Sequence, residues 1–190
     1  MKRIELLQEG DAWLKWRRTC LTASDSAIIN GSSPYCDIDT LRMRKLGLIP
    51  EELCNRWMQR GKDLEPVARK SFIEGTGIYV EPAVVESTDY PFLGASLDGI
   101  SNCGKFLLEV KCGKASHKLA LKGEIPIYYL SQIQHQLICT RAEKCYYYSF
   151  DGTDGVCIEV LPDLEFEKEY LPKAVEFWMS LIFYIFEIKH

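Results

Sequence analysis

Two charged residues, Glu109 and Lys111, end the otherwise apolar stretch FLLEVK, whose composition is typical of a β-strand. Because side chains alternate between the faces of a strand, Glu109 and Lys111 point to one face and Val110 to the other. Asp98 lies upstream in the segment LDG, and a turn at SNCG would bring its strand beside this one. The pattern gathers two carboxylates and an ammonium group at one end of a small sheet.

These groups together predict a particular chemistry. Asp98, Glu109 and the main-chain carbonyl of Val110 form an oxygen-rich set that suits a hard divalent cation such as Mg²⁺. A cation there neutralises charge on a phosphate, and Lys111 is placed to hold the attacking hydroxide or the developing negative charge. The set suits phosphodiester hydrolysis. The alternative is structural, because E-x-K also occurs on exposed strands and Asp-Gly is an ordinary turn.

Hydrophobic periodicity and turn residues predict the elements that position these groups. Helices are expected over about 11–21, after TASD with Thr22 or Ser24 as N-cap, and over 39–46, 52–75, 116–123, 128–140 and 163–190. Strands are expected in GIYVEPAVVES, YPFLGASLDG and KFLLEVK as an antiparallel meander, and in KCYYYSFD and GVCIEVL. Pro66 predicts a kink or a restart of its helix near Leu64, and Pro172 predicts a bend.

This order of elements indicates one α/β (α+β) domain over residues 1–190, with a central mixed β-sheet flanked by helices. Glu65 lies on the helix that precedes the strands, and Gln132 lies on a helix that follows them. Both side chains can therefore flank the same edge of the sheet.

Composition limits the classes of partner and location. The chain of 190 residues has a net charge of −4, so no overall basic field indicates a nucleic-acid partner. The acidic excess lies in residues 126–190, so a polyanion is expected to meet the preceding two thirds. Eight cysteines without a C-x-x-C pair, and no apolar signal segment at the start, predict reduced thiols in the cytoplasm. The run AVEFWMSLIFYIFEI is too short and too charged to span a bilayer.

Five stretches occur in one order across most of residues 9–150: GDAWLKWRRTCLTASD, RGKDLEPVARKSFIEGTG, GASLDGI, LLEVKC and YYLSQIQHQLICT. Together they resemble the lambda exonuclease and YqaJ-type viral recombinase group of the PD-(D/E)XK nucleases. The chain departs from the signature at Leu97, where a proline is usual, and after Lys111, where CGKASH replaces the usual Cys-Pro. The resemblance implies a fold with the restriction-endonuclease-like core of that group.

The resemblance also implies catalytic roles. Asp98 and Glu109 would ligate Mg²⁺ together with Val110, Mn²⁺ would substitute for it, and Glu65 would be an outer carboxylate of the same metal site. In the same way Lys111 would position the nucleophile.

Gln132 matches a family position that orients the nucleophile or the catalytic lysine, with the neighbouring Gln134 as the alternative. Arg17, Ser24 and Ser96 match positions that grip the 5′ phosphate of the substrate strand, which suits a bidentate guanidinium and two hydroxyl donors. Arg18 is the rival of Arg17. Trp13, in the same stretch, is expected to pack in the core, although stacking on an unpaired base is the alternative.

The activity implied by the resemblance is a Mg²⁺-dependent exonuclease that acts 5′ to 3′ on double-stranded DNA ends and leaves 3′ overhangs for recombination. A single-strand annealing recombinase and a homotrimer are the implied partners, in the cytoplasm of a host cell or the nucleus for a eukaryotic virus. The alternatives are a nicking or structure-specific endonuclease and a catalytically silent DNA-binding relative. The silent relative is disfavoured because a buried carboxylate pair repels itself without a metal.

Overall fold

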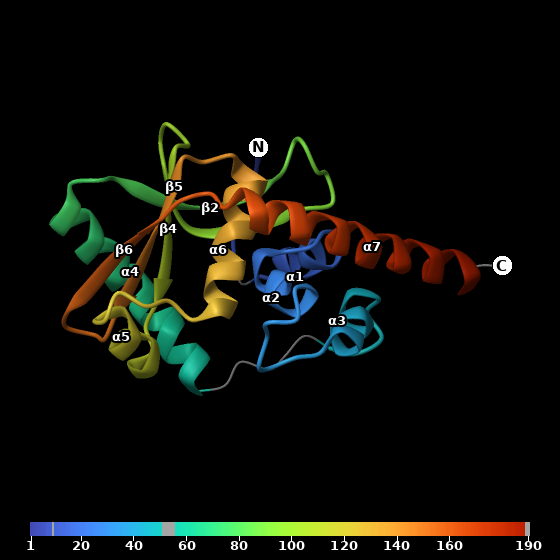
Figure 1. The fold of residues 1–190 in the computed structure, drawn as a ribbon, viewed down its shortest axis with the longest axis horizontal. Coiled ribbons are helices and arrows are strands. Elements are labelled where there is room, and N and C mark those ends of the chain that lie inside the picture. Colours follow the sequence, from blue (N-terminus) through green and yellow to red (C-terminus); the bar gives the residue numbers. More distant parts are fainter. Residues whose placement is uncertain (9, 51–55, 189–190) are drawn as a thin grey trace.

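A six-stranded sheet runs through the centre of the molecule in the computed structural model, which describes residues 1–8, 10–50 and 56–188 (Figure 1). The strands lie in chain order: β1 (Lys2–Ile4), β2 (Val80–Glu86), β3 (Gly94–Ser101), β4 (Phe106–Lys111), β5 (Lys144–Phe150) and β6 (Gly155–Val160). Neighbours are antiparallel except for β4 and β5, which are parallel and joined through two helices. The predicted mixed sheet is confirmed, and β1 is an additional edge strand that the sequence did not predict.

Helices cover both faces of this sheet (Figure 1). They are α1 (Asp11–Arg18), α2 (Ala23–Ile29), α3 (Ile38–Lys45), α4 (Arg56–Thr76), α5 (Lys114–Ala120), α6 (Ile127–Thr140) and α7 (Leu164–Ile188). The larger core joins α2, α6 and α7 to β3, β4 and β5, and the smaller core packs α4 on the opposite face. In β4, Leu107 belongs to the larger core whereas Leu108 and Val110 belong to the smaller one, as alternation predicts.

Two prolines lie inside continuous helices, so the helix around Pro66 does not restart near Leu64, whereas a kink there and the bend expected at Pro172 stay predictions. Pro66 lies within α4 and Pro172 within α7. Ala68 and Phe72, on the side of α4 that faces the sheet, are fully buried. Packing of this apolar face outweighs the one main-chain hydrogen bond that proline removes.

Other expectations on local structure are confirmed or fall outside the described residues. Thr22 is the N-cap of α2 and forms a capping box with Asp25. The cysteines of the described residues are free thiols, whereas Cys54, the expected helix start near Glu52 and the side chain of Trp57 lie outside those residues. No helix in the described ranges has both the length and the apolar character needed to cross a bilayer.

His135 ties α6 to two other elements from a fully buried position. Its Nδ1 lies 2.8 Å from the hydroxyl of Tyr170 on α7, and its Nε2 lies 2.9 Å from the carbonyl oxygen of Gly94 on β3. Burial lowers the pKa of this imidazole from 6.5 to about 4. The folded state therefore holds His135 neutral where the unfolded chain takes up a proton.

This burial predicts a pH-dependent stability. The contribution of His135 is fully present above the unfolded pKa of 6.5 and is lost as the pH falls towards the folded value of about 4. Thermal unfolding between pH 8 and 4.5 should show a steeper acid loss of Tm for the wild type than for His135→Gln, which stays neutral throughout. Parallel curves for the two proteins would contradict this assignment.

Candidate active site

Strands β3 and β4 separate where the predicted site begins. They pair at only two positions next to their connecting turn, and beyond these positions the Oδ2 of Asp98 accepts a hydrogen bond of 2.8 Å from the N–H of Val110. Between Leu97 and Ile100, β3 has one residue more than the facing stretch of β2, which is a β-bulge. The bulge and the separation together turn the Asp98 carboxylate towards the end of β4. The contact made by Val110 is through its N–H, and metal ligation by its carbonyl remains a prediction.

The carboxylate of Glu109 is buried, with 1% of its side chain exposed. Its Oε1 accepts hydrogen bonds from Lys111 Nζ and, at 2.7 Å, from Gln132 Nε2. Its Oε2 accepts a hydrogen bond of 2.6 Å from Gln136 Nε2. Gln132 and Gln136 are one turn apart on α6, so a single helical face supplies a donor to each oxygen.

Electrostatics link Asp98 to this group. Burial and the neighbouring carboxylates of Glu109 and Glu65 raise the pKa of Asp98 well above its usual value. Burial alone lowers the pKa of Lys111, but the charges of Glu109 and Asp98 outweigh it and hold that pKa above the ordinary value. The site thus contains closely spaced carboxyl groups beside the ammonium group of Lys111, which stays protonated.

Glu65 occupies an outer position on α4. Its Oε1 accepts a hydrogen bond of 2.9 Å from Arg69, and the same guanidinium nitrogen donates to the main-chain oxygen of Asp98. Arg69, one turn after Glu65, therefore fixes this carboxylate relative to β3. The structure brings together all five predicted catalytic side chains, which are Glu65, Asp98, Glu109, Lys111 and Gln132.

The donor set fits a divalent cation. In the described part of the chain, no three His, Cys, Asp or Glu side chains converge into a complete metal-binding group. The available donors are the carboxylates of Asp98 and Glu109, with Glu65 further out. This set agrees with Mg²⁺, which is commonly bound by one or two carboxylates and keeps several water ligands. The raised pKa of Asp98 marks a charge excess that such a cation would compensate.

A second polar cluster contains the three residues predicted to bind phosphate. Arg17 donates a hydrogen bond of 2.9 Å to Ser24 Oγ, and its guanidinium lies 4.8 Å from the centre of the Trp13 ring. The indole N–H of Trp13 donates a hydrogen bond of 2.6 Å to Ser96 Oγ. Trp13 therefore joins Arg17 to Ser96. The rival Arg18 is exposed and lies towards Gly47 instead.

A buried ion pair fixes the turn that carries this cluster. Lys45 of α3 pairs with Asp25, with 3% and 6% of the two side chains exposed. Lys45 Nζ also donates hydrogen bonds to the main-chain oxygens of Arg17 at 2.7 Å and Cys20 at 2.8 Å. Burial raises the pKa of Asp25, but the charges of Lys45 and Arg17 lower it below its usual value. The end of α1 and the start of α2 are thus held by one ammonium group.

Several of these contacts differ from the sequence-based expectation. Gln134, the alternative to Gln132, lies away from Glu109 and instead bonds the main chain of Leu161 and Asp163 ahead of α7. Gln136 was missed, although its spacing of four residues from Gln132 was a usable signal. Trp13 is partly buried, as expected, but its N–H contributes to the polar cluster. Lys45 carried no local signal, because its partners are remote in the sequence.

Comparisons with known proteins identify the family of this chain. The YqaJ-like viral recombinase domain family matches residues 12–143. Protein YqaJ of Bacillus subtilis (strain 168) is 29% identical over 189 residues, which cover 93% of this chain and 59% of that protein. The chain therefore spans about three fifths of the length of this curated relative.

Solved structures share the fold. The alkaline exonuclease LHK-Exo from Laribacter hongkongensis, in its complex with dAMP, superimposes with a TM-score of 0.82 at 26% identity, covering 95% of this chain and 96% of that one. A phage-related exonuclease from Haemophilus somnus 129PT gives a TM-score of 0.65 at 16% identity, covering 87% and 96% of the two chains. The predicted PD-(D/E)XK core is confirmed, and the chain belongs to the YqaJ-like viral recombinase domain family.

Proposed function

We propose that this chain is a divalent-metal-dependent DNA exonuclease that degrades the 5′-phosphorylated strand at duplex ends. The observation that carries the proposal is the buried Glu109 carboxylate, held by Lys111, Gln132 and Gln136 beside an Asp98 whose pKa is raised. A structural ion pair does not require a second crowded carboxylate. The likeness to LHK-Exo, an alkaline exonuclease, supports the same reaction class.

Each residue of the site has a proposed role. Asp98 and Glu109 would hold Mg²⁺, or Mn²⁺ in its place, which when bound neutralises phosphate charge and favours ionisation of water. Lys111 positions the nucleophile and stabilises negative charge on the phosphate. Gln132 and Gln136 keep the Glu109 carboxylate in one orientation.

The second cluster gives the proposed direction. Arg17, Ser24 and Ser96 offer a cation and two hydroxyl groups at one end of β3, which suits a terminal phosphate. Holding that phosphate beside the metal site favours cleavage from the 5′ end, and the opposite strand is left as a 3′ overhang.

The wider assembly is part of the same proposal. A single-strand annealing recombinase would receive the overhang, a homotrimer would enclose the duplex, and the reaction would take place in the host cytoplasm. A single nuclease domain over residues 1–190 is also proposed, from the order of elements in the sequence. The recombinase and the homotrimer rest on the sequence resemblance described above.

Among the predictions about function, the first concerns metal dependence and Lys111. Linear duplex DNA should be degraded with Mg²⁺ and persist with EDTA, and Lys111→Ala should lower the rate at least a hundredfold while DNA binding is retained. Degradation is followed on gels, and binding by fluorescence anisotropy. Equal persistence of DNA in Mg²⁺ and EDTA would contradict the proposed nuclease activity. Cleavage by Lys111→Ala at the wild-type rate would show that Lys111 does not position the nucleophile.

The second prediction separates Arg17 from its neighbour. Arg17→Ala should lose about tenfold in the ratio of cleavage rates on 5′-phosphate over 5′-hydroxyl ends, because a charge-assisted contact is removed. Arg18→Ala is the matched control and should keep the wild-type ratio. An unchanged ratio in Arg17→Ala would favour an endonuclease that does not read the end.

The third prediction concerns the buried pair. Lys45→Met should destabilise the fold by about 3–5 kcal/mol, because Asp25 is left as an uncompensated buried charge. The double variant Lys45→Met/Asp25→Asn should regain part of that stability. The single and the double variant should both show a lower 5′-phosphate preference than the wild type, because the main-chain oxygen of Arg17 has lost its hydrogen bond from Lys45. Denaturant unfolding and end-selective rates test the two effects. A full wild-type preference in the double variant would show that Lys45 matters only for folding.

A further inference from the structure

Tyr129 of α6 borders the active site next to Lys111. The Nζ of Lys111 lies over the Tyr129 ring, 4.8 Å from its centre, within the range of a cation–π contact. Gln132 and Gln136 lie three and seven residues further along the helix, so they share one face of α6 with Tyr129. That face therefore contacts both charged side chains at the end of β4, the glutamines at Glu109 and the ring at Lys111.

Two further tyrosines fix the orientation of this ring. The Tyr128 ring packs edge-on against it, with the ring centres 4.4 Å apart. The Tyr147 ring lies on its other flank, with the centres 6.2 Å apart and an angle of 34° between the planes. Tyr147 is fully buried on β5 and pairs directly with Glu109 of β4. The Tyr129 ring is therefore held in a packed aromatic wall beside the ammonium group.

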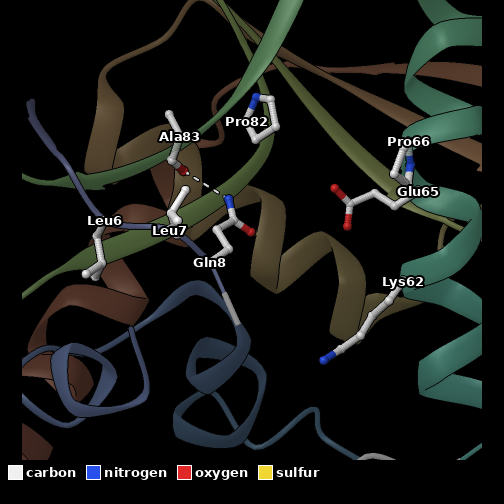
Figure 2. Close-up of a pocket in the computed structure, with 8 residues that line it drawn as sticks. All are labelled: Leu6, Leu7, Gln8, Lys62, Glu65, Pro66, Pro82 and Ala83. Atoms are coloured by element: carbon white, nitrogen blue, oxygen red, sulfur yellow. Dashed lines mark hydrogen bonds between the residues drawn. The ribbon is translucent and has the colours of Figure 1, made fainter. Parts of the chain in front are cut away.

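The α4 side of the site has a different character. There a pocket of about 410 Å³ reaches Glu65 between the N-terminal segment, α4 and β2. Figure 2 shows that aliphatic side chains line it together with Gln8, Lys62 and Glu65. None of the described residues that line this pocket is aromatic. The ring contact with Lys111 thus belongs to the α6 side of the site.

Glu109 holds Lys111 less strongly when its carboxylate ligates a cation. Its Oε1 accepts hydrogen bonds from both Lys111 and Gln132, which fills the two acceptor sites of a carboxylate oxygen. A cation on this carboxylate competes for the same lone pairs and repels the ammonium group. The face of a tyrosine ring attracts an ammonium group without using any oxygen of the metal site. Cation binding therefore weakens the ion pair and leaves the ring contact in place.

We infer that Tyr129 is a positioning residue that keeps the ammonium group of Lys111 at the site when the Glu109 carboxylate ligates the metal ion. The inference rests on the proposed function. The ring, and not the phenol hydroxyl, is the group that acts, because the electron-rich face makes the contact. Removal of the ring should slow cleavage of bound DNA, whereas the binding of DNA should be unaffected.

The test compares Tyr129→Phe, which keeps the ring, with Tyr129→Leu, which removes it. Tyr129→Leu should lower the degradation rate at saturating DNA about tenfold and keep the DNA concentration for half-maximal rate within about twofold of the wild type. Tyr129→Phe should keep the wild-type rate. Tyr146→Leu is the matched control and should also keep it, because it removes a ring 5.7 Å from Lys144 Nζ on the α4 side of the sheet.

A second measurement needs no enzymatic activity. Protons above an aromatic ring resonate upfield, so the ε-methylene protons of Lys111 should be shifted upfield in the wild type and in Tyr129→Phe. The shift should disappear in Tyr129→Leu. Spectra of protein with ¹³C-labelled lysine are recorded without metal and with Mg²⁺, and Lys111→Ala identifies the signal. The upfield shift should persist in Mg²⁺.

Loss of the upfield shift on addition of Mg²⁺ would overturn the inference, as would a wild-type rate in Tyr129→Leu. Equal losses of rate in Tyr129→Leu and Tyr129→Phe would also overturn it, because the hydroxyl would then be the acting group. All three results leave the nuclease proposal standing. If Tyr129→Leu does not fold, the Mg²⁺ dependence of the wild-type signal decides. A wild type that cuts no DNA ends the proposed function, and the spectra still show whether the ring holds the ammonium group.

Discussion

Glu109 places a carboxylate where almost none of its surface meets water, and such a charge is costly unless its oxygens are hydrogen-bonded. Lys111 and Gln132 serve one oxygen and Gln136 serves the other. These contacts require α6 to lie over β4 in one register, and the parallel pairing of β4 with β5 places the connecting helices accordingly. The arrangement of that half of the molecule thus depends on satisfying one buried charge.

Strand β3 connects the site around Glu109 to the second polar cluster. Its bulge aims Asp98 at the end of β4, while Ser96, two residues earlier, meets Trp13 and through it Arg17. The second polar cluster, which contains Trp13, Arg17, Ser24 and Ser96, is held in turn by Lys45 of α3, which donates a hydrogen bond to the main-chain oxygen of Arg17. Strand β3 therefore fixes the spacing between Ser96, which is proposed to hold the strand end, and Asp98, which is proposed to hold the metal ion.

Functional groups that lie close together in the sequence, at a spacing typical of one strand or hairpin, could be predicted. E-x-K on an apolar strand, with Asp98 across a turn, identified the centre, and hydrophobic periodicity with turn residues predicted most of the helices and strands. Contacts between remote segments were not predictable: Lys45 meets residues more than twenty positions earlier, and Gln8 reaches β3. Helix α4 continued through Pro66 because burial of its apolar face outweighed the local preference of proline.

The central claim is that Asp98 and Glu109 together form a divalent-cation site. Binding of Mn²⁺ to the purified protein, followed by the electron paramagnetic resonance signal of the free ion, tests it without reference to DNA. The account predicts saturable binding by the wild type and at least tenfold weaker binding by Asp98→Asn, which removes one charge at constant shape. Equal Mn²⁺ affinity in the two proteins would contradict the account.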